Sequence, residues 1–249
     1  VVRMGEQKTP GMFNFANVCE MGSRVDTVAL EQLGNTLSPN DPINIQFTSG
    51  TTGTPKGATL THCNILNNAY FTGQSMHLSA ADRLCIPVPM YHCFGMVLGT
   101  LVCVAHGATM VLPCEVFDPE SVLRSVQDEK CTALHGVPTM FIAELDLPHF
   151  SEFDVSSLRT GVIAGSTCPI ELMKRLIEDM DLTEIVIGYG QTECSPINSM
   201  TAIEDSFEAR VTTVGRAHDN WELKIILENG ETAGIGETGE VSSINLLAV

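Results

Sequence analysis

Hydrophobic residues alternate along most of the chain between short strand-like runs and longer amphipathic stretches. Strand-like runs lie at residues 43–47, 83–88, 109–112, 132–135, 159–164 and 184–187. Helix-like stretches lie at residues 25–33, 61–75, 94–105, 119–130, 138–145 and 169–180. Strands that alternate with helices of this length are typical of a parallel sheet covered on both faces. The pattern predicts an α/β fold of parallel strands flanked by helices.

Turn-forming residues and a change of pattern divide the chain into three expected segments. Ser38–Pro42 combines Ser, Pro, Asn and Asp, and ends an N-terminal segment expected at 1–40. The α/β core is expected at 41–213. Beyond it, strands are expected at 222–227 and 240–247 around a hairpin-like turn at 228–231. The start of a smaller β subdomain is therefore expected at 214–249.

Composition and charge narrow the classes of partner. Hydrophobic residues make up 44% and charged residues 17% of the 249 residues, which is a globular composition. The net charge of −17 disfavours binding to nucleic acid or to an anionic membrane surface. The longest apolar run, 93–105, falls short of the ~20 residues of a membrane span. A nucleotide site would need a magnesium ion and a few cations, and Lys56 and Arg83 are the only basic residues between Val25 and Leu123.

The cysteines and histidines give little sign of a metal site. Nine cysteines occur without a Cys-x-x-Cys pair, so buried thiols in a reducing compartment are expected. His92 and Cys93 are adjacent, and neighbouring residues of a strand would point to opposite faces. The histidines other than His92 are expected to be structural or surface residues.

Thr48–Gly57 is the segment richest in candidate chemistry. It contains four threonines, one serine, three glycines and one lysine, and follows the strand expected at 43–47. Backbone amides, hydroxyl groups and an ammonium group can together bind phosphate oxygens. The Walker A pattern does not fit, because Pro55 and Gly57 stand where it needs Gly and Ser/Thr. A flexible linker is the alternative interpretation.

This loop resembles the phosphate loop of the adenylate-forming, or AMP-binding, superfamily, which includes acyl-CoA synthetases, luciferases and peptide-synthetase adenylation domains. Further segments follow in that family's order, at 89–95, 165–169, 188–193, 214–216 and 236–241. Residues 41–57 and 158–166 are most similar to mitochondrial medium-chain acyl-CoA synthetases. The resemblance implies the large N-terminal domain of an adenylate-forming enzyme.

The implied reaction joins a fatty acid to ATP, releases pyrophosphate, and passes the acyl group to coenzyme A. Magnesium would be the metal cofactor, and the partners would be small molecules. The resemblance assigns the phosphate site to Thr48, Ser49, Gly50, Thr51, Thr52, Gly53, Thr54 and Lys56. Ser49, Thr51, Thr52 and Lys56 would hold the β- and γ-phosphates. Such groups neutralise and position phosphate charge.

The resemblance also places the adenine and the α-phosphate. Gly165, Ser166 and Thr167 would form one wall of the adenine slot, with Thr167 at a position where relatives commonly carry proline. On the other side, within Gly188, Tyr189 and Gly190, Tyr189 would stack on adenine. Thr192 would bind the α-phosphate, and Glu193 would bind magnesium, with Thr52 as a further ligand. Lys56, His92, Thr192 and Glu193 are the implied catalytic residues.

Several residues keep two interpretations. A histidine such as His92 is commonly a core residue, but in the family pattern it lies beside the reacting carboxylate. Phe94–Leu98 and Val137–Phe141 fit an acyl tunnel or ordinary core packing. Arg216 fits a contact near coenzyme A or the adenylate, or a surface ion pair.

The family's ribose-binding Asp, its hinge and its C-terminal lysine domain have no counterpart in the chain. We therefore expect a fragment that carries the ATP- and acyl-binding core and is incomplete for catalysis. One alternative is a truncated product that only binds nucleotide or lipid, and another is adenylation with a different acceptor. By resemblance alone, the location would be mitochondrial.

Overall fold

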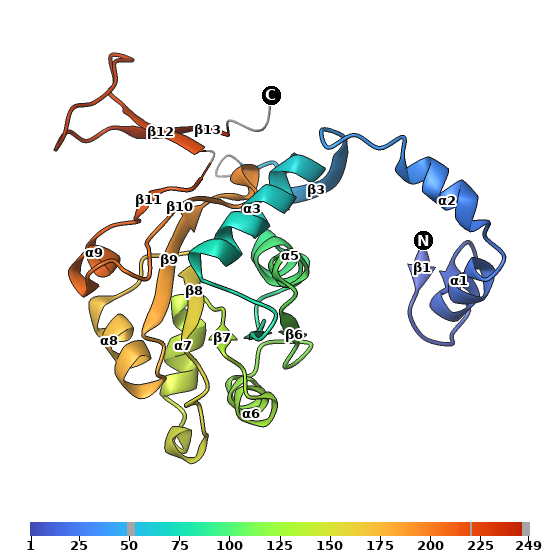
Figure 1. The fold of residues 1–249 in the computed structure, drawn as a ribbon, viewed down its shortest axis with the longest axis horizontal. Helices are drawn as coiled ribbons and strands as arrows, with labels where there is room; N and C mark the ends of the chain where they lie inside the picture. The colour runs from blue at the N-terminus through green and yellow to red at the C-terminus, as the bar shows by residue number, and fades with distance from the viewer. Residues whose placement is uncertain (49–52, 220, 246–249) are drawn as a thin grey trace. The chain divides into compact units, whose positions relative to one another are not determined.

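A computed structural model describes residues 1–48, 53–219 and 221–245 of the chain, which divides into two compact units, Val1–Asp41 and Pro42–Val249. In the first unit, β1 (Val2–Arg3) pairs in parallel with β2 (Phe13–Asn14), and two short helices follow (Figure 1). The expected helix is α2 (Thr27–Gly34), which begins after Asp26, whose carboxylate accepts a hydrogen bond from Val28 N–H at 2.9 Å. Helix α1 (Phe15–Gly22) was not expected.

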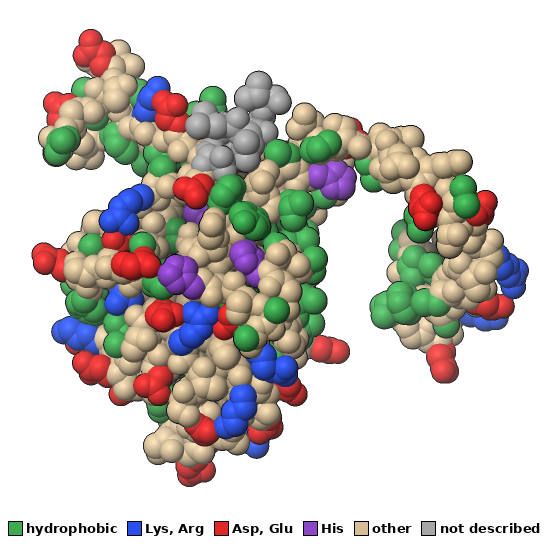
Figure 2. Space-filling view, viewed as in Figure 1, with side chains coloured by type: hydrophobic (Ala, Val, Ile, Leu, Met, Phe, Trp, Pro, Cys, Tyr) green, Lys and Arg blue, Asp and Glu red, His purple; other side chains and the backbone are tan. Residues whose placement is uncertain are grey.

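Neither helix of this first unit has a buried residue, and apolar side chains lie exposed along both (Figure 2). The unit is thus small and has almost no core of its own. The segment boundaries expected at 40–41 and 213–214 stay predictions.

The second unit is built on a mixed sheet. Between residues 83 and 217 seven strands form it in the order β11-β10-β9-β8-β7-β5-β6 (Figure 1). The five strands from β6 to β9 are parallel, and β10 and β11 add antiparallel to β9. The bounds are β5 Arg83–Cys85, β6 Thr109–Val111, β7 Ala133–Leu134, β8 Thr160–Ala164, β9 Glu184–Gly190, β10 Ile197–Met200 and β11 Arg216–Ala217. The expected α/β class with a mostly parallel sheet is confirmed.

Helices cover both faces of this sheet, because successive strand residues point to opposite sides. In β8, Val162 and Ala164 pack in one core cluster, and Ile163 packs in the other. The first cluster lies under α3 (His62–Ser75) and the helical segment made of α4 (Cys93–Gly95), the π-helix η1 (Met96–Leu101) and α5 (Val102–His106). The second lies under α6 (Pro119–Glu129), α7 (Pro138–Leu145) and α8 (Ile170–Asp179) (Figure 1).

Local sequence explains how several of these helices begin. Thr61 and Asn64 form the capping box of α3, with Asn64 N–H to Thr61 Oγ1 at 3.2 Å and Thr61 N–H to Asn64 Oδ1 at 3.2 Å. Asp118 caps α6, which has Pro119 in its first turn, where no donor is needed.

The segment around the Gly/Thr loop differs from the expected strand–loop–helix. Strand β3 (Pro42–Thr48) is followed after the loop by a second strand, β4 (Lys56–Thr61), which pairs antiparallel with β3 before α3 begins. The helix expected from Thr61 is confirmed as α3, but strand β4 between the loop and this helix was not expected. Polar and apolar residues alternate weakly over Lys56–Thr61, and the strand is held by its backbone pairing with β3.

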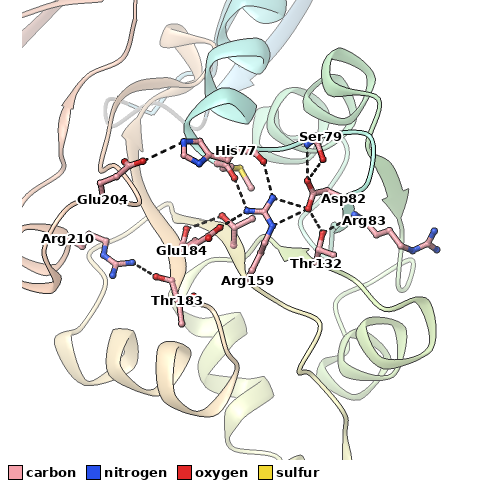
Figure 3. Close-up of polar contacts among 12 residues, drawn as sticks. His77, Ser79, Asp82, Arg83, Thr132, Arg159, Thr183, Glu184, Glu204 and Arg210 are labelled. Carbon is pink, nitrogen blue, oxygen red and sulfur yellow. Dashed lines mark hydrogen bonds and ion pairs between the residues drawn. The ribbon is translucent and has the colours of Figure 1, made fainter.

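Ion pairs and hydrogen bonds tie the amino-terminal ends of the parallel strands together. Arg159, just before β8, contacts Asp82 at 2.9 Å and Glu184 at 2.5 Å (Figure 3). Asp82 also accepts a hydrogen bond from the hydroxyl group of Thr132, at 2.7 Å. Burial by itself would raise the pKa of Asp82, but hydrogen bonds from Thr132 and Arg159 outweigh it and hold the pKa below its usual value. This polar cluster fixes one end of the sheet and leaves the carboxyl end for ligands.

The chain after the sheet forms a ribbon. β12 (Trp221–Ile226) pairs antiparallel with β13 (Glu240–Asn245), close to the strands expected at 222–227 and 240–247. Three short helical segments complete the described elements: α9 (Phe207–Thr212), η2 (Phe150–Glu152) and η3 (Thr192–Cys194). None of the helices in the described ranges is long and apolar enough to cross a bilayer.

Candidate functional site

A cavity of about 330 Å³ opens at the carboxyl ends of β8 and β9, where ligands bind in sheets of this kind. We call it the His92 cavity. Its apolar wall comes from Phe94, Leu98, Ala164, Pro196 and Ile197, and its polar wall from Thr48, His92, Cys93, Gln191, Thr192 and Glu193. Gly165, Gly188 and Gly190 complete the lining. A mostly apolar space with a few converging polar groups suits an amphiphilic ligand.

A second cavity of about 730 Å³ shares three glycines with the first. We call it the Tyr189 cavity. Gly165–Cys168 lines one side, Ile187–Gly190 another, and Val211–Gly215 a third. The expected adenine-slot residues Ser166, Thr167 and Tyr189 therefore lie together around one cavity. Within Val211–Gly215, the sequence pointed only to the family segment that starts at residue 214. Residues 211–213 were missed because the short helix α9 has no clear amphipathic pattern.

The segment Gly188–Gly190 separates the two cavities. It was expected to follow a strand, but β9 continues through Gly190 and pairs with β10, so the ligand-facing residues belong to the sheet itself. A Cβ at Gly188 would lie 2.8 Å from Ile197 Cδ1, and a Cβ at Gly190 would overlap the Pro196 carbonyl oxygen. Glycine is needed at both positions because the neighbouring chain approaches so closely.

The turn from Gln191 to Pro196 carries the next two predicted residues. Gln191 N–H donates to Pro196 O at 2.9 Å, and Ser195 N–H donates to Thr192 O at 3.1 Å. These bonds close the turn and place Thr192 and Glu193 on the wall of the His92 cavity. The Thr192 hydroxyl lies 3.8 Å from the sulfur of Cys93. Thr192 is half-buried and Glu193 is exposed.

His92 lies at the start of α4, not in a strand, so the strand-based argument about its neighbour was wrong. Phe94 N–H donates to His92 Nδ1 at 3.0 Å, which makes Nδ1 an acceptor and leaves the proton of the neutral ring on Nε2. Partial burial lowers the pKa of His92. The ring is therefore a neutral hydrogen-bond donor at the cavity wall at pH 7. Cys93 is buried, and desolvation raises the pKa of its thiol.

The Gly/Thr loop is described only at its two ends. Thr48 lines the His92 cavity at the end of β3, and Gly53 and Thr54 are exposed. Ser49, Gly50, Thr51 and Thr52 lie outside the described residues. Lys56 begins β4, opposite Thr48 in the hairpin, and is exposed. Among the ion pairs of the described residues none involves Lys56, so its charge is not neutralised by a neighbouring carboxylate.

The structure also shows the positions of the remaining residues for which the sequence left two interpretations. Arg216 pairs with Asp205 at 2.7 Å, as in the surface ion-pair interpretation. Phe94 and Leu98 line the His92 cavity, whereas Phe141 is fully buried in the opposite core cluster. His135 is also fully buried, and its ring accepts from Val162 N–H at 3.1 Å and donates to Leu98 O at 2.8 Å. It is a structural residue behind the cavity wall.

The donor groups present fit a nucleotide with magnesium better than a resident metal ion. In the described parts of the chain, no group of three or more His, Cys, Asp or Glu side chains could hold a metal by itself. Glu193 and Thr192 offer oxygen atoms, which magnesium prefers, and the ion commonly takes its other ligands from phosphate and water.

Fold and site together define an α/β protein with two adjoining cavities at the carboxyl edge of its sheet. Residues 6–243 match the family described as AMP-binding enzyme, and the chain belongs to that family. It is 50% identical over 226 residues to a protein named putative acyl-CoA synthetase YngI of Bacillus subtilis, covering 91% of this chain and 41% of that protein. It is 43% identical over 239 residues to the medium-chain acyl-CoA ligase ACSF2, mitochondrial, of Danio rerio, covering 95% and 39%.

A solved structure supports the same assignment. The anthranilate CoA ligase AuaEII, determined in complex with anthranoyl-AMP, matches with a TM-score of 0.82 and 27% identity, over 96% of this chain and 45% of that one. The expected membership of the adenylate-forming enzymes is confirmed. The chain spans about 40% of the length of the curated relatives named above.

Proposed function

We propose that this chain forms the ATP- and acid-binding part of an acyl-CoA ligase. In the complete protein, a carboxylic acid would react with ATP to form an acyl-adenylate and pyrophosphate, and the acyl group would pass to coenzyme A. One observation carries the proposal: the His92 and Tyr189 cavities meet along Gly188–Gly190. Because the reaction joins a carboxylate to the α-phosphate, the acid and the nucleotide must share a boundary of this kind.

The nucleotide would lie with its adenine in the Tyr189 cavity. Tyr189 is 41% exposed, so a flat base could cover its ring. Thr192, on the wall of the His92 cavity, would donate its hydroxyl proton to the α-phosphate. Lys56 and the Gly/Thr loop would hold the β- and γ-phosphates until pyrophosphate leaves. Magnesium held by Glu193 would supply positive charge that this acidic protein lacks.

The acid would enter the His92 cavity with its carboxylate toward His92. A neutral ring with its proton on Nε2 can donate a hydrogen bond to one carboxylate oxygen and leave the other free to attack phosphorus. Phe94, Leu98 and Ile197 would contact the apolar chain of the acid. A medium-chain fatty acid and a mitochondrial location come from the names of relatives such as the zebrafish protein and belong to this proposal.

Equilibrium binding to the purified chain tests the proposal. We expect binding of ATP with magnesium and tighter binding of a non-hydrolysable acyl-adenylate analogue, which fills both cavities. Thr192→Val should weaken binding of AMP and ATP roughly tenfold, because the α-phosphate loses one hydrogen bond. The matched control is Thr183→Val, at an exposed position before β9 outside both cavities, which should bind as the wild type does.

Lys56→Ala separates the phosphate roles. It should weaken ATP binding and leave AMP binding unchanged, because AMP lacks the β- and γ-phosphates. A chain that binds neither nucleotide nor the analogue contradicts the proposal. Binding without pyrophosphate exchange by the complete protein would favour the alternative of a non-catalytic nucleotide- or lipid-binding product. With an active complete protein, thioester formation from coenzyme A distinguishes a ligase from an enzyme with another acceptor.

A further inference from the structure

Asn68, a buried residue of α3, binds the backbone that follows the candidate α-phosphate residue. It is 3% exposed. Its Nδ2 donates to Ile197 O at 2.6 Å, and Ile197 N–H donates to its Oδ1 at 3.1 Å. The amide thus exchanges two hydrogen bonds with one residue of β10, as a neighbouring strand would. A flipped amide would place donor against donor and acceptor against acceptor, so the pairing sets the orientation of the side chain.

These bonds hold the end of the turn Gln191–Pro196. Asn68 Nδ2 also lies 3.5 Å from the carbonyl oxygen of Cys194, within the turn. The register of β10 against β9 shifts between Ile197 and Ser199, so the ladder is irregular where Asn68 takes part. The turn carries Thr192 at the cavity wall, and Ile197 itself lines the same cavity.

Helix α3 links this turn to the hairpin of the Gly/Thr loop. β4 begins at Lys56 and runs into α3 through the capping box at Thr61. β4 also contacts η3, the helical turn that contains Thr192. Ile65 and Ala69 anchor α3 in the core beneath, so Asn68 projects from a fixed helix. Helix α3 therefore holds both the hairpin of the Gly/Thr loop and the turn Gln191–Pro196.

We propose that Asn68 is a positioning residue that holds the Gln191–Pro196 turn so that Thr192 meets the α-phosphate of the nucleotide. The inference rests on the proposed function and adds a residue outside both cavities to it. Asn68 touches neither nucleotide nor acid. It acts through the backbone of Cys194 and Ile197.

Nucleotide affinity tests the role, with AMP and ATP as probes. Asn68→Ala should weaken binding of both about tenfold, because each needs the α-phosphate contact and the loss of one buried hydrogen-bonded amide is of this size. The matched control is Asn67→Ala. Asn67 is the preceding residue of α3, and its Nδ2 donates to Cys63 O within the same helix at 2.9 Å. This control should bind both nucleotides as the wild type does.

The conservative variant Asn68→Asp provides a rescue. At pH 8 the new carboxylate can accept from Ile197 N–H but cannot donate to Ile197 O, and the two oxygen atoms repel. At pH 6 a protonated carboxyl group, favoured by burial, restores both bonds. Affinity for AMP, relative to the wild type at each pH, should therefore rise as the pH falls. The ratio removes the effect of His92 and Glu193, which face the cavity in both proteins.

Hydrogen exchange distinguishes failure of this inference from failure of the proposed function, because it needs no ligand. In Asn68→Ala, the amides of Cys194, Ser195 and Ile197 should exchange faster, and those of β8 should keep their rates. If the wild type binds no nucleotide, the proposed function fails, and exchange still tests the contact. Unchanged exchange at these amides, or AMP affinity equal to that of the wild type, overturns the inference. The inference also fails if the AMP affinity of Asn68→Asp does not rise as the pH falls. It fails as well if Asn68→Ala and Asn68→Asp both lose cooperative unfolding, because Asn68 would then be needed for folding of the whole unit.

Discussion

Glu144 of α7 is a buried carboxyl group whose two oxygen atoms have no hydrogen-bond partner. Burial raises its pKa well above the usual value, because the charged form is disfavoured away from water. The folded pKa lies above the unfolded one, near 4.5, so its contribution to stability is complete at low pH and is lost as the pH rises above that value.

An apolar residue of similar size should therefore stabilise the chain. We expect Glu144→Met to increase the free energy of unfolding by about 2 kcal/mol at pH 7.5, and by less at pH 5. Urea unfolding at the two pH values measures this. Glu171→Met, at an exposed position of α8, serves as the control and should change stability little at either pH. A loss of stability in Glu144→Met at pH 7.5 would mean that the carboxyl group has a partner in solution.

Gly190 has no room for a side chain. A Cβ there would overlap the Pro196 carbonyl oxygen, so Gly190→Ala must push the turn Gln191–Pro196 away from β9. We expect weaker AMP binding, by roughly tenfold or more, and a lower melting temperature. The control is Gly34→Ala at the end of α2, where a Cβ meets no atom within 4 Å. Wild-type AMP binding by Gly190→Ala would show that the turn can move without loss of the site.

Among the elements, the parallel strands depend on the polar cluster around Asp82 and Arg159 (Figure 3). Asp82 lies before β5, Arg159 before β8, and Glu184 begins β9, so one guanidinium group joins three strands. Arg159 also donates to the carbonyl oxygens of Met76 and His77, after α3. Loss of one member leaves buried partners without their bonds.

We expect Asp82→Asn to lower the free energy of unfolding by about 1–3 kcal/mol at pH 7, because Arg159 and Thr132 lose a charged acceptor. Since the folded pKa of Asp82 lies below its unfolded value, wild-type stability from this group is present at neutral pH and is lost as the pH falls through that low value. Chemical unfolding measures the change. Glu120→Gln removes an exposed ion pair with Arg124 and should have little effect.

For the whole molecule, two buried histidines add to the loss of stability in acid. Burial lowers the pKa of His135 to about 4, and likewise that of His218 to about 4. Both folded values lie below the unfolded value of 6.5, so the unfolded chain binds protons first as the pH falls. Stability from these groups is complete above about pH 6.5 and is lost between that value and about pH 4.

Protonation of each histidine can therefore lower the free energy of unfolding by up to roughly 3 kcal/mol over this pH range. We expect the free energy of unfolding to fall between pH 7 and pH 5, and the fall to be smaller in His218→Gln. His218 is the better variant because neither of its ring nitrogens has a hydrogen-bond partner among the described residues. His62→Gln, at a partly exposed position, is the control. An equal fall in both variants would assign the acid response to other groups.

Much of the fold follows from local pattern. The helices at 62–75, 119–129 and 138–145 lie within a residue or two of their expected positions. The caps of the first two, the proline in the first turn of the last two and the apolar spacing are all local properties. The Gly/Thr loop and the ordered family segments likewise come from short stretches of chain. The AMP-binding family could therefore be identified from residues alone.

Strand β4, the extension of β9 through Gly190, and the strands β10 and β11 were missed. Each of these strands is held by backbone pairing with another strand. Many of their residues are Gly, Thr or Ser, and their sequences show no strong periodicity. Asn68 was missed for the same reason. Nothing near it in the chain indicates that its amide pairs with Ile197, 129 residues away.

Local spacing along the chain thus specified the α/β class, most helices and the Gly/Thr loop that we propose binds phosphate. Three-dimensional packing brought His92, Thr192 and the glycines of β9 to one cavity wall. It also made Glu144, His135 and His218 buried titratable groups. Periodicity depends on neighbours a few residues apart, whereas burial and pairing depend on residues that meet only when the sheet closes.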